Sequence, residues 1–256
     1  RESEFRSGDA PFSEPETQNI RSLGTWIPAG LGLSVHSGAT NIGWGWNFTE
    51  ERTNHDHLLE EIAERYADNC TTEDFWTTNG AAWYITNGDT TDWSYGRHGT
   101  LDYTLEVSRH KHPSSSQMEQ VIAEHTDAIE QAALWPWWIT GQVTDEITGN
   151  GIPAEVHIRD LIQPIVTGPD GRFSRPVYNE DVSVRIESSG FVDKEIRLDP
   201  NGPSAPIALS RGEVSAVHPI DLVLDTSGTF QLDDDATNVV FHQPGQDDFI
   251  AEPSND

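Results

Sequence analysis

One carboxylate and one histidine are the first candidates for acid–base and metal chemistry in this sequence. Glu106 lies near the end of segment 101–107, whose alternating LDYTLEV pattern is typical of a half-buried strand. A carboxylate on a rigid strand can act as a general base, and a loop tyrosine such as Tyr84 could assist it. His36 follows the short apolar segment 31–35, and a neutral imidazole can ligate a metal ion. The structural alternatives are a surface glutamate beside an aromatic loop and a hydrogen-bonded histidine at a strand end.

The spacing of these residues resembles the C-terminal part of the catalytic domain of zinc metallocarboxypeptidases. Tyr84 precedes Asp92 by eight positions and Glu106 by twenty-two, and the family places its loop tyrosine, Asp-Trp pair and catalytic glutamate at the same intervals. The resemblance implies that Glu106 is the general base and then the general acid, acting on a zinc-bound water. It also implies that Tyr84 closes over the substrate, and that Asp92 orders its loop.

The same resemblance assigns three more residues. In the family, a His-Ser or His-Gly pair at this place supplies the third Zn²⁺ ligand, which makes His36 a ligand and Ser37 a contact for the penultimate substrate residue. Thr91 aligns with the floor of the pocket for the C-terminal side chain, but its hydroxyl does not indicate which residue is preferred. The implied partners are the C-termini of peptides or proteins.

Composition narrows the classes of partner. The 256 residues include 43 acidic and 15 basic side chains, which gives a formal net charge of −28. Such a chain is a poor match for nucleic acid or for anionic membrane surfaces. No apolar run approaches the roughly 18 residues that span a bilayer, and the single Cys70 excludes an intrachain disulfide. The absence of an initial Met or signal peptide suggests a fragment, and we expect a secreted or extracellular protein of unknown oligomeric state.

The pattern of hydrophobic residues predicts two folded parts and a tail. Residues 1–136 are expected to form the C-terminal part of an α/β catalytic domain with a mixed sheet and flanking helices. Residues 137–211 alternate like short strands with turns between them, and they resemble the all-β transthyretin-like sandwich that follows the catalytic domain in one carboxypeptidase subfamily. Residues 212–256 are expected to be an acidic linker or an incomplete further β-unit, with strands near 222–224 and 229–232.

Local signals add detail to the first part. We expect a helix from about Ser13 to Leu23, with Ser13 as its cap, and a loop over residues 41–54. His55 and His57 are interpreted as the solvated start of a helix. A turn is predicted at Asn79-Gly80. A last helix should begin near residue 114, with these residues on its apolar face: Met118, Val121, Ile122, Ile129, Ala132 and Ala133.

Two features of the family are missing from this sequence. No His-x-x-Glu pair precedes His36, and no arginines stand in the context that grips a terminal carboxylate. We therefore expect the isolated chain to be an inactive fragment of a metallocarboxypeptidase. The alternative is a non-catalytic adhesion or binding protein, in which a degenerate peptidase domain supports the sandwich. The presence of His36, Tyr84 and Glu106 favours the enzyme.

Overall fold

The computed structural model describes residues 10–27, 29–159, 161–204 and 206–212. Beyond these it gives four two-residue strands: β12 Val223–Leu224, β13 Phe230–Gln231, β14 Val240–Phe241 and β15 Phe249–Ile250. β12 and β13 pair with each other and fall within the two tail segments expected to be strands. The rest of the tail lies outside the described residues.

A mixed four-stranded sheet forms the centre of the first part. Its order is β1-β4-β2-β3, with the bounds β1 Leu31–His36, β4 Leu101–Val107, β2 Thr40–Trp44 and β3 Trp76–Asn79. β1 runs parallel to β4, and β4 runs antiparallel to β2. The expectation of a loop over residues 41–54 was therefore wrong at its start, because β2 is an interior strand whose five residues are all buried.

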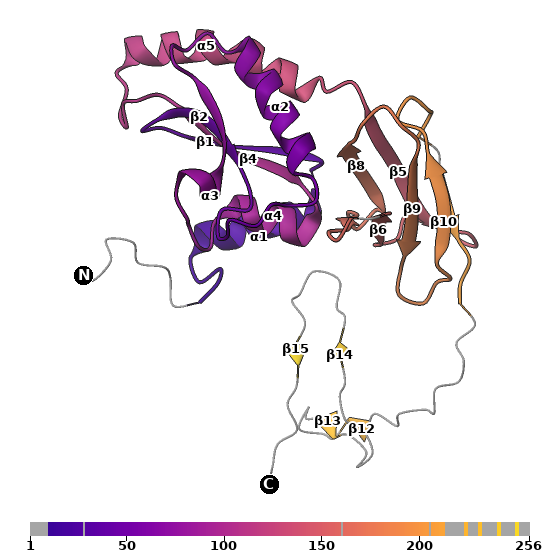
Figure 1. Ribbon diagram of the computed structural model, residues 1–256. Helices are drawn as coiled ribbons and strands as arrows, with labels where there is room; N and C mark the ends of the chain where they lie inside the picture. Colours follow the sequence, from indigo (N-terminus) through magenta and orange to yellow (C-terminus); the bar gives the residue numbers. More distant parts are fainter. Residues whose placement is uncertain are drawn as a thin grey trace.

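Helices lie on both sides of this sheet (Figure 1). α2 (Asp56–Asn69) and α5 (Ser115–Ala133) cover one face, where Leu101, Tyr103 and Leu105 of β4 are fully buried with residues of both helices. α4 (Thr90–His98) packs against the opposite face of β4, and α1 (Pro15–Trp26) packs on α4. The core thus lies on one side of β4, and the even-numbered residues of that strand point to the side of α4.

Three sequence expectations about the helices need correction. The cap of α1 is Glu14 rather than Ser13, and its side chain makes no capping bond. Within α5 the buried residues are His125, Ala128 and Ala132, whereas Ile122 is 60% exposed on the face expected to be apolar and buried. The narrow gap to α2 accommodates alanines, so the larger residues point outward. His55 is buried rather than solvated, since its Nδ1 lies 2.6 Å from the Tyr95 hydroxyl.

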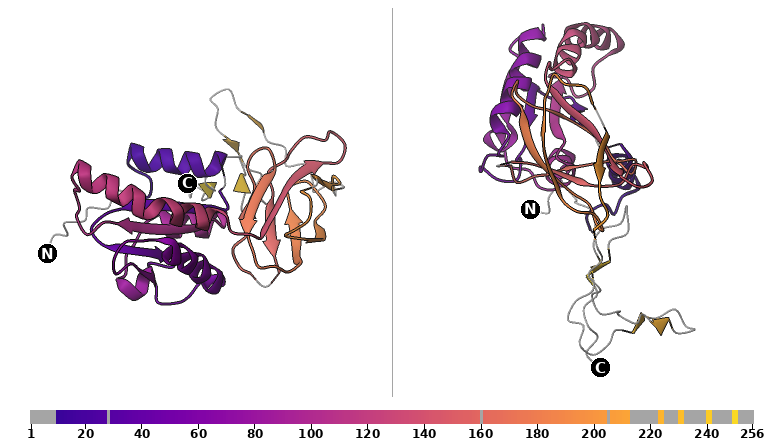
Figure 2. Two further views of the ribbon diagram at one scale, coloured as in Figure 1. Left: turned by 90° about the horizontal axis from the view of Figure 1, so that it is seen from above. Right: turned by 90° about the vertical axis from the view of Figure 1, so that its right-hand side faces the viewer.

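The second part consists of two small sheets packed face to face (Figure 2). One sheet has the order β10-β9-β6-β7 and the other β11-β5-β8. The bounds are β5 Trp138–Asp145, β6 Glu155–Ile158, β7 Ile165–Val166, β8 Arg172–Pro176, β9 Val182–Glu187, β10 Lys194–Leu198 and β11 Pro206–Leu209. Alternating residues such as Ile139, Val143, Val156 and Ile186 are fully buried between the sheets. The alternation in the sequence therefore predicted real strands, although it missed β7 and β11.

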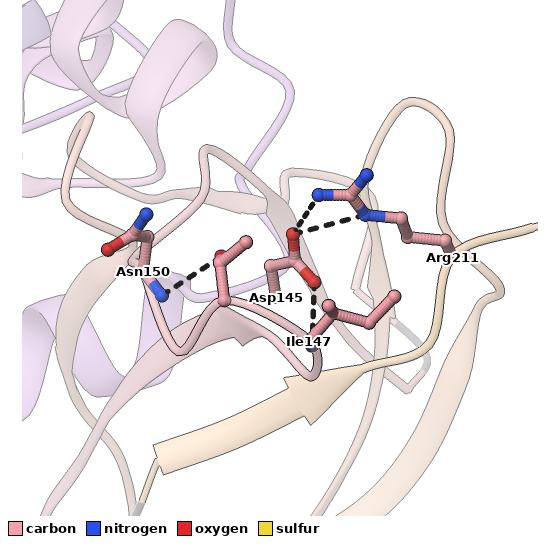
Figure 3. Close-up of polar contacts among 5 residues, drawn as sticks. Asp145, Ile147, Asn150 and Arg211 are labelled. Atoms are coloured by element: carbon pink, nitrogen blue, oxygen red, sulfur yellow. Dashed lines mark hydrogen bonds and ion pairs between the residues drawn. The ribbon is translucent and has the colours of Figure 1, made fainter.

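A buried carboxylate closes one end of these sheets (Figure 3). Asp145, at the end of β5, accepts hydrogen bonds from Arg211 Nε at 3.1 Å, Arg211 Nη2 at 2.5 Å and the amide of Ile147 at 2.9 Å. These contacts lower the pKa of Asp145 to about 2, with Arg211 the largest cause. Arg211 follows β11, so the pair fastens β11 to β5, the first strand of these sheets.

The two parts meet at the segment after α5 and at α4. The Trp135 indole donates to the carbonyl of Val177 at 2.8 Å, and Trp137 packs against both hydrophobic cores. Arg175 of β8 is 1% exposed, and its guanidinium lies 6.0 Å from the centre of the Tyr95 ring in α4. Burial lowers the pKa of Arg175 to about 10, so the side chain remains a cation at neutral pH.

Candidate active site

His36 and Glu106 lie side by side at the ends of two adjacent parallel strands. In the register of β1 and β4, His36 is the direct partner of Glu106. Both side chains therefore project from the same face of the sheet, at the carboxyl ends of the two strands. This edge is where open α/β sheets place their ligands. His36 and Glu106 are seventy positions apart in the sequence, and the parallel pairing of β1 with β4 places them next to each other.

The Glu106 carboxylate is partly exposed but has one shielded oxygen. Its Oε2 atom is buried and has no hydrogen-bond partner in the described part of the chain. On the far side of β4, the register pairs Glu106 with Asn41 of β2. Asn41 is 1% exposed, and its Nδ2 is likewise buried without a partner among the described residues. His36, Glu106 and Asn41 thus form one row across three strands.

Thr91 lies below this row, where α4 meets the sheet. It is 1% exposed, and its Oγ1 lies 3.1 Å from Oγ1 of Thr104, two residues before Glu106 on the same face of β4. Opposite Thr104 on β2 is Gly43, which adds no side chain to this face. The surface beneath Glu106 is therefore formed by two hydroxyls and a glycine.

The first turn of α4 is anchored by two carboxylates. Asp89 caps the helix by accepting from the amide of Asp92 at 2.9 Å. Asp92 in turn accepts from the amides of Asn47 at 2.9 Å and Phe48 at 3.1 Å. Burial raises the pKa of Asp92 to about 6 despite these hydrogen bonds. These contacts join α4 to the loop after β2, which agrees with the expected role of Asp92 in ordering its surroundings.

Tyr84 and Ser37 lie on two other segments. Tyr84 directly follows the short helix α3 (Gly80–Trp83), is 53% exposed and packs edge to face on Trp83 with ring centres 4.7 Å apart. Ser37 follows His36, and its hydroxyl donates to the carbonyl of Lys111 at 3.0 Å. The turn predicted at Asn79-Gly80 is instead the start of α3. Gly80 is needed there for close approach, because a Cβ would lie 1.6 Å from Oδ1 of Asn47.

The described residues do not complete a zinc site by themselves. No group of three or more His, Cys, Asp or Glu side chains in this part of the chain is arranged to hold a metal ion. A catalytic zinc needs three protein ligands and one open position. His36 is exposed at the strand end and fits the part of a single ligand. This chain can therefore contribute to a zinc centre but does not form one from the residues described.

The structure adds residues to the site that the sequence did not suggest. Asn41 escaped notice because it falls within a segment interpreted as a loop. α4 was missed as well, although Asp89 is a good N-cap and Gly99 ends the helix with a positive φ of 69°. Those two signals, nine residues of helix apart, could have identified it.

Comparisons with known proteins agree with the resemblance in the sequence. A zinc carboxypeptidase family profile matches residues 1–128, half of the chain. Carboxypeptidase D of Mus musculus is 26% identical over 250 residues, covering 84% of this chain and 18% of that protein. Carboxypeptidase Z of Gallus gallus is 25% identical over 234 residues, covering 81% of this chain and 35% of that protein. The chain therefore spans only a minor part of the curated relatives that it matches.

Solved structures show more distant likenesses. The carboxypeptidase A of Helicoverpa armigera aligns with a TM-score of 0.44 and 21% identity, covering 49% of this chain and 35% of that one. Bovine thrombin-activatable fibrinolysis inhibitor, solved in complex with tick carboxypeptidase inhibitor, aligns with a TM-score of 0.45 and 20% identity, covering 51% and 48%. No helix among the described residues is long and apolar enough to cross a membrane. On the strength of the family match over its first half, the chain belongs to the zinc carboxypeptidase family.

Proposed function

We propose that this chain is part of a zinc-dependent carboxypeptidase that hydrolyses the last peptide bond of peptides or proteins. The observation that carries the proposal is the direct register pairing of His36 with Glu106 at the carboxyl ends of β1 and β4. This pair supplies one metal ligand and the carboxylate base, two of the groups that such a hydrolysis requires. The family membership of the chain makes peptide C-termini the expected substrates.

The candidate residues have distinct roles in this reaction. His36 supplies one ligand of the zinc ion. Glu106 accepts a proton from the water that attacks the carbonyl carbon, and it then returns that proton to the leaving amine nitrogen. Tyr84, exposed after α3, contacts the bound substrate, and Ser37 helps to hold its penultimate residue. Thr91 lies at the floor of the pocket for the C-terminal side chain, below Glu106.

The isolated chain should lack this activity, because the described residues supply one metal ligand rather than three. The surface near β1 supports the same view. β1 is an edge strand of the described sheet, and Val35 within it is 62% exposed. Leu23 and Trp26 of α1 are 54% and 70% exposed. An open strand edge beside exposed apolar side chains suits coverage by a further part of the same domain.

Two wider assignments belong to this proposal. Residues 137–211 correspond to a transthyretin-like sandwich that accompanies the catalytic domain, since the described sheets in this range share one core. Residues 212–256 form a linker or a further β-unit. The complete protein is secreted or extracellular, which suits its strongly acidic composition.

Substitutions in the complete protein test the roles. Glu106→Gln keeps the shape of the side chain but removes the base, so kcat/KM should fall about 10²–10⁴-fold while zinc remains bound. His36→Ala should lose both zinc and activity. Tyr84→Phe should be milder, because it removes one neutral hydrogen bond worth about 0.5–1.5 kcal/mol. Zinc content and kcat/KM are measured for each variant.

The matched control is Glu64→Gln, which changes an exposed glutamate on α2, on the other side of the sheet. It should leave both zinc content and kcat/KM unchanged. A kcat/KM of Glu106→Gln close to that of the parent would show that Glu106 is not the general base. Peptide hydrolysis that persists after zinc has been removed would show that the proposed zinc-dependent function is wrong.

A further inference from the structure

Asn41 and Glu106 present complementary polar atoms that are both left unpaired. Asn41 Nδ2 is a hydrogen-bond donor, Glu106 Oε2 is an acceptor, and each is buried without a partner in the described part of the chain. The two residues are direct partners in the antiparallel register of β2 and β4, and they project from the same face. Side chains at such positions have Cβ atoms about 4.5–5.5 Å apart, which is within reach of an amide–carboxylate hydrogen bond.

Neighbouring residues offer Asn41 no better acceptor. Along β2 the same face carries Gly43, which has no side chain. Across β3 the register partner of Asn41 is Trp76, whose indole nitrogen is a donor only. Diagonally across β4 lies Thr104, whose hydroxyl is already within 3.1 Å of Thr91. Among the direct register partners of Asn41, Glu106 is the one that carries a buried acceptor without a partner in the described part of the chain.

We propose that the Asn41 side-chain amide donates a hydrogen bond to Oε2 of Glu106 and holds that carboxylate in its working orientation. The functional part of this inference rests on the role of Glu106 in the proposed function. A buried donor and a buried acceptor each cost free energy while unpaired, and their pairing removes both costs. A hydrogen bond to a carboxylate is charge-assisted and fixes a side chain that otherwise rotates about three bonds.

The hydrogen bond to Asn41 would also give the two oxygens of the Glu106 carboxylate different roles. Oε2 is the shielded atom and becomes the anchored one. Oε1 then remains available to take and return the proton, on a carboxylate whose other register neighbour is His36. Asn41 is thus a positioning residue that touches neither substrate nor metal.

The first experiment uses this chain as it stands and needs no activity. The side-chain amide protons of Asn41 are followed by ¹⁵N–¹H NMR in the parent chain and in Glu106→Gln. If the pair forms, replacing the charged acceptor by a neutral amide should shift the Asn41 amide signals while the backbone signals of the sheet persist. Asn41 amide signals at the same positions in Glu106→Gln and in the parent would overturn the proposal.

The second experiment measures the consequence in the complete protein. Asn41→Leu has a similar volume but no donor, so it should lower kcat roughly 10-fold while KM changes little. Asn79→Leu is the matched control in the same sheet, because the Asn79 amide is already bonded to the carbonyl of Trp44 at 3.3 Å. It should lower thermal stability and leave kcat unchanged. Equal kcat values for Asn41→Leu and the parent would exclude the positioning role.

The two experiments separate the possible failures. If Glu106→Gln leaves hydrolysis intact, the proposed function of Glu106 fails, whatever the NMR signals show. If Glu106→Gln abolishes hydrolysis but leaves the Asn41 amide signals unchanged, only the inference about Asn41 fails.

Discussion

Replacing Asp102 by Asn should change how stability depends on pH. Asp102 lies on β4, is 7% exposed and sits against β1, where a Cβ on Gly32 would be 2.6 Å from its Oδ1. Burial raises its pKa to about 6, while the hydroxyl of Ser94 and the amide of Tyr103, 2.9 Å from Oδ1, act in the opposite direction. The folded chain therefore binds this proton more tightly than the unfolded chain does.

The sign and the size of the effect follow from linkage. Between pH 4 and pH 6 the folded state holds the proton and the unfolded state releases it, so the free energy of unfolding falls as pH rises. A rise of the pKa of Asp102 from the usual 3.8 to about 6 corresponds to about 2–3 kcal/mol at pH 7, at 1.36 kcal/mol per pKa unit. Asn keeps the size of the side chain but has no proton to release. The variant should therefore gain about 2 kcal/mol over the parent between pH 4 and pH 7.

Urea unfolding at a series of pH values measures this difference. Circular dichroism at the helical band reports on the first part of the chain, since the described helices all lie between residues 15 and 133. Asp127→Asn, an exposed carboxylate on α5, is the control and should track the parent at every pH. A difference between Asp102→Asn and the parent that stays constant from pH 4 to pH 7 would refute the reasoning.

Two further predictions concern the sheets of the second part. Arg211 and the amide of Ile147 hold the pKa of Asp145 at about 2, so the stability from this carboxylate is present above about pH 4 and is lost as pH falls toward 2. Arg211→Met should move the midpoint of acid unfolding of these sheets to higher pH, and an unchanged midpoint would show that the Arg211–Asp145 pair is not what stabilises them. Residues 137–211 expressed alone should give β-type circular dichroism and a cooperative thermal transition, because their strands share one core. A disordered spectrum would contradict this boundary.

The sequence predicted the elements whose patterns are regular. β1 and β4 were identified from short apolar or alternating segments, α2 from helical spacing, and α5 from helical spacing and a start signal near residue 114. Five of the strands between Trp138 and Leu198 followed the alternation of buried and exposed residues. These elements pack on one side and face solvent or a polar surface on the other. Under that condition, the periodicity of hydrophobic residues along the sequence indicates the type of element.

The features that the sequence did not predict lie where burial does not follow such a periodicity. β2 is buried on both faces and contains Asn41 and Gly43, so it has neither alternation nor a continuous apolar run. α5 has helical spacing, but its packing against α2 selects small residues, so the larger apolar side chains were assigned to the wrong face. The pairing of His36 with Glu106 depends on strand register, which no local pattern specifies.

The placement of α4 explains how both parts of the chain shape the candidate site. Its first turn, with Thr91, is tied through Asp92 to the loop after β2. Its last turn lies against the second part, where Tyr95 packs under the buried Arg175. The partial negative charge at the end of a helix favours a nearby cation, and a Cβ at the terminal Gly99 would lie 3.0 Å from Arg175 Nη1. Because α4 is held at both ends, the floor beneath Glu106 is fixed jointly by the central sheet and by β8.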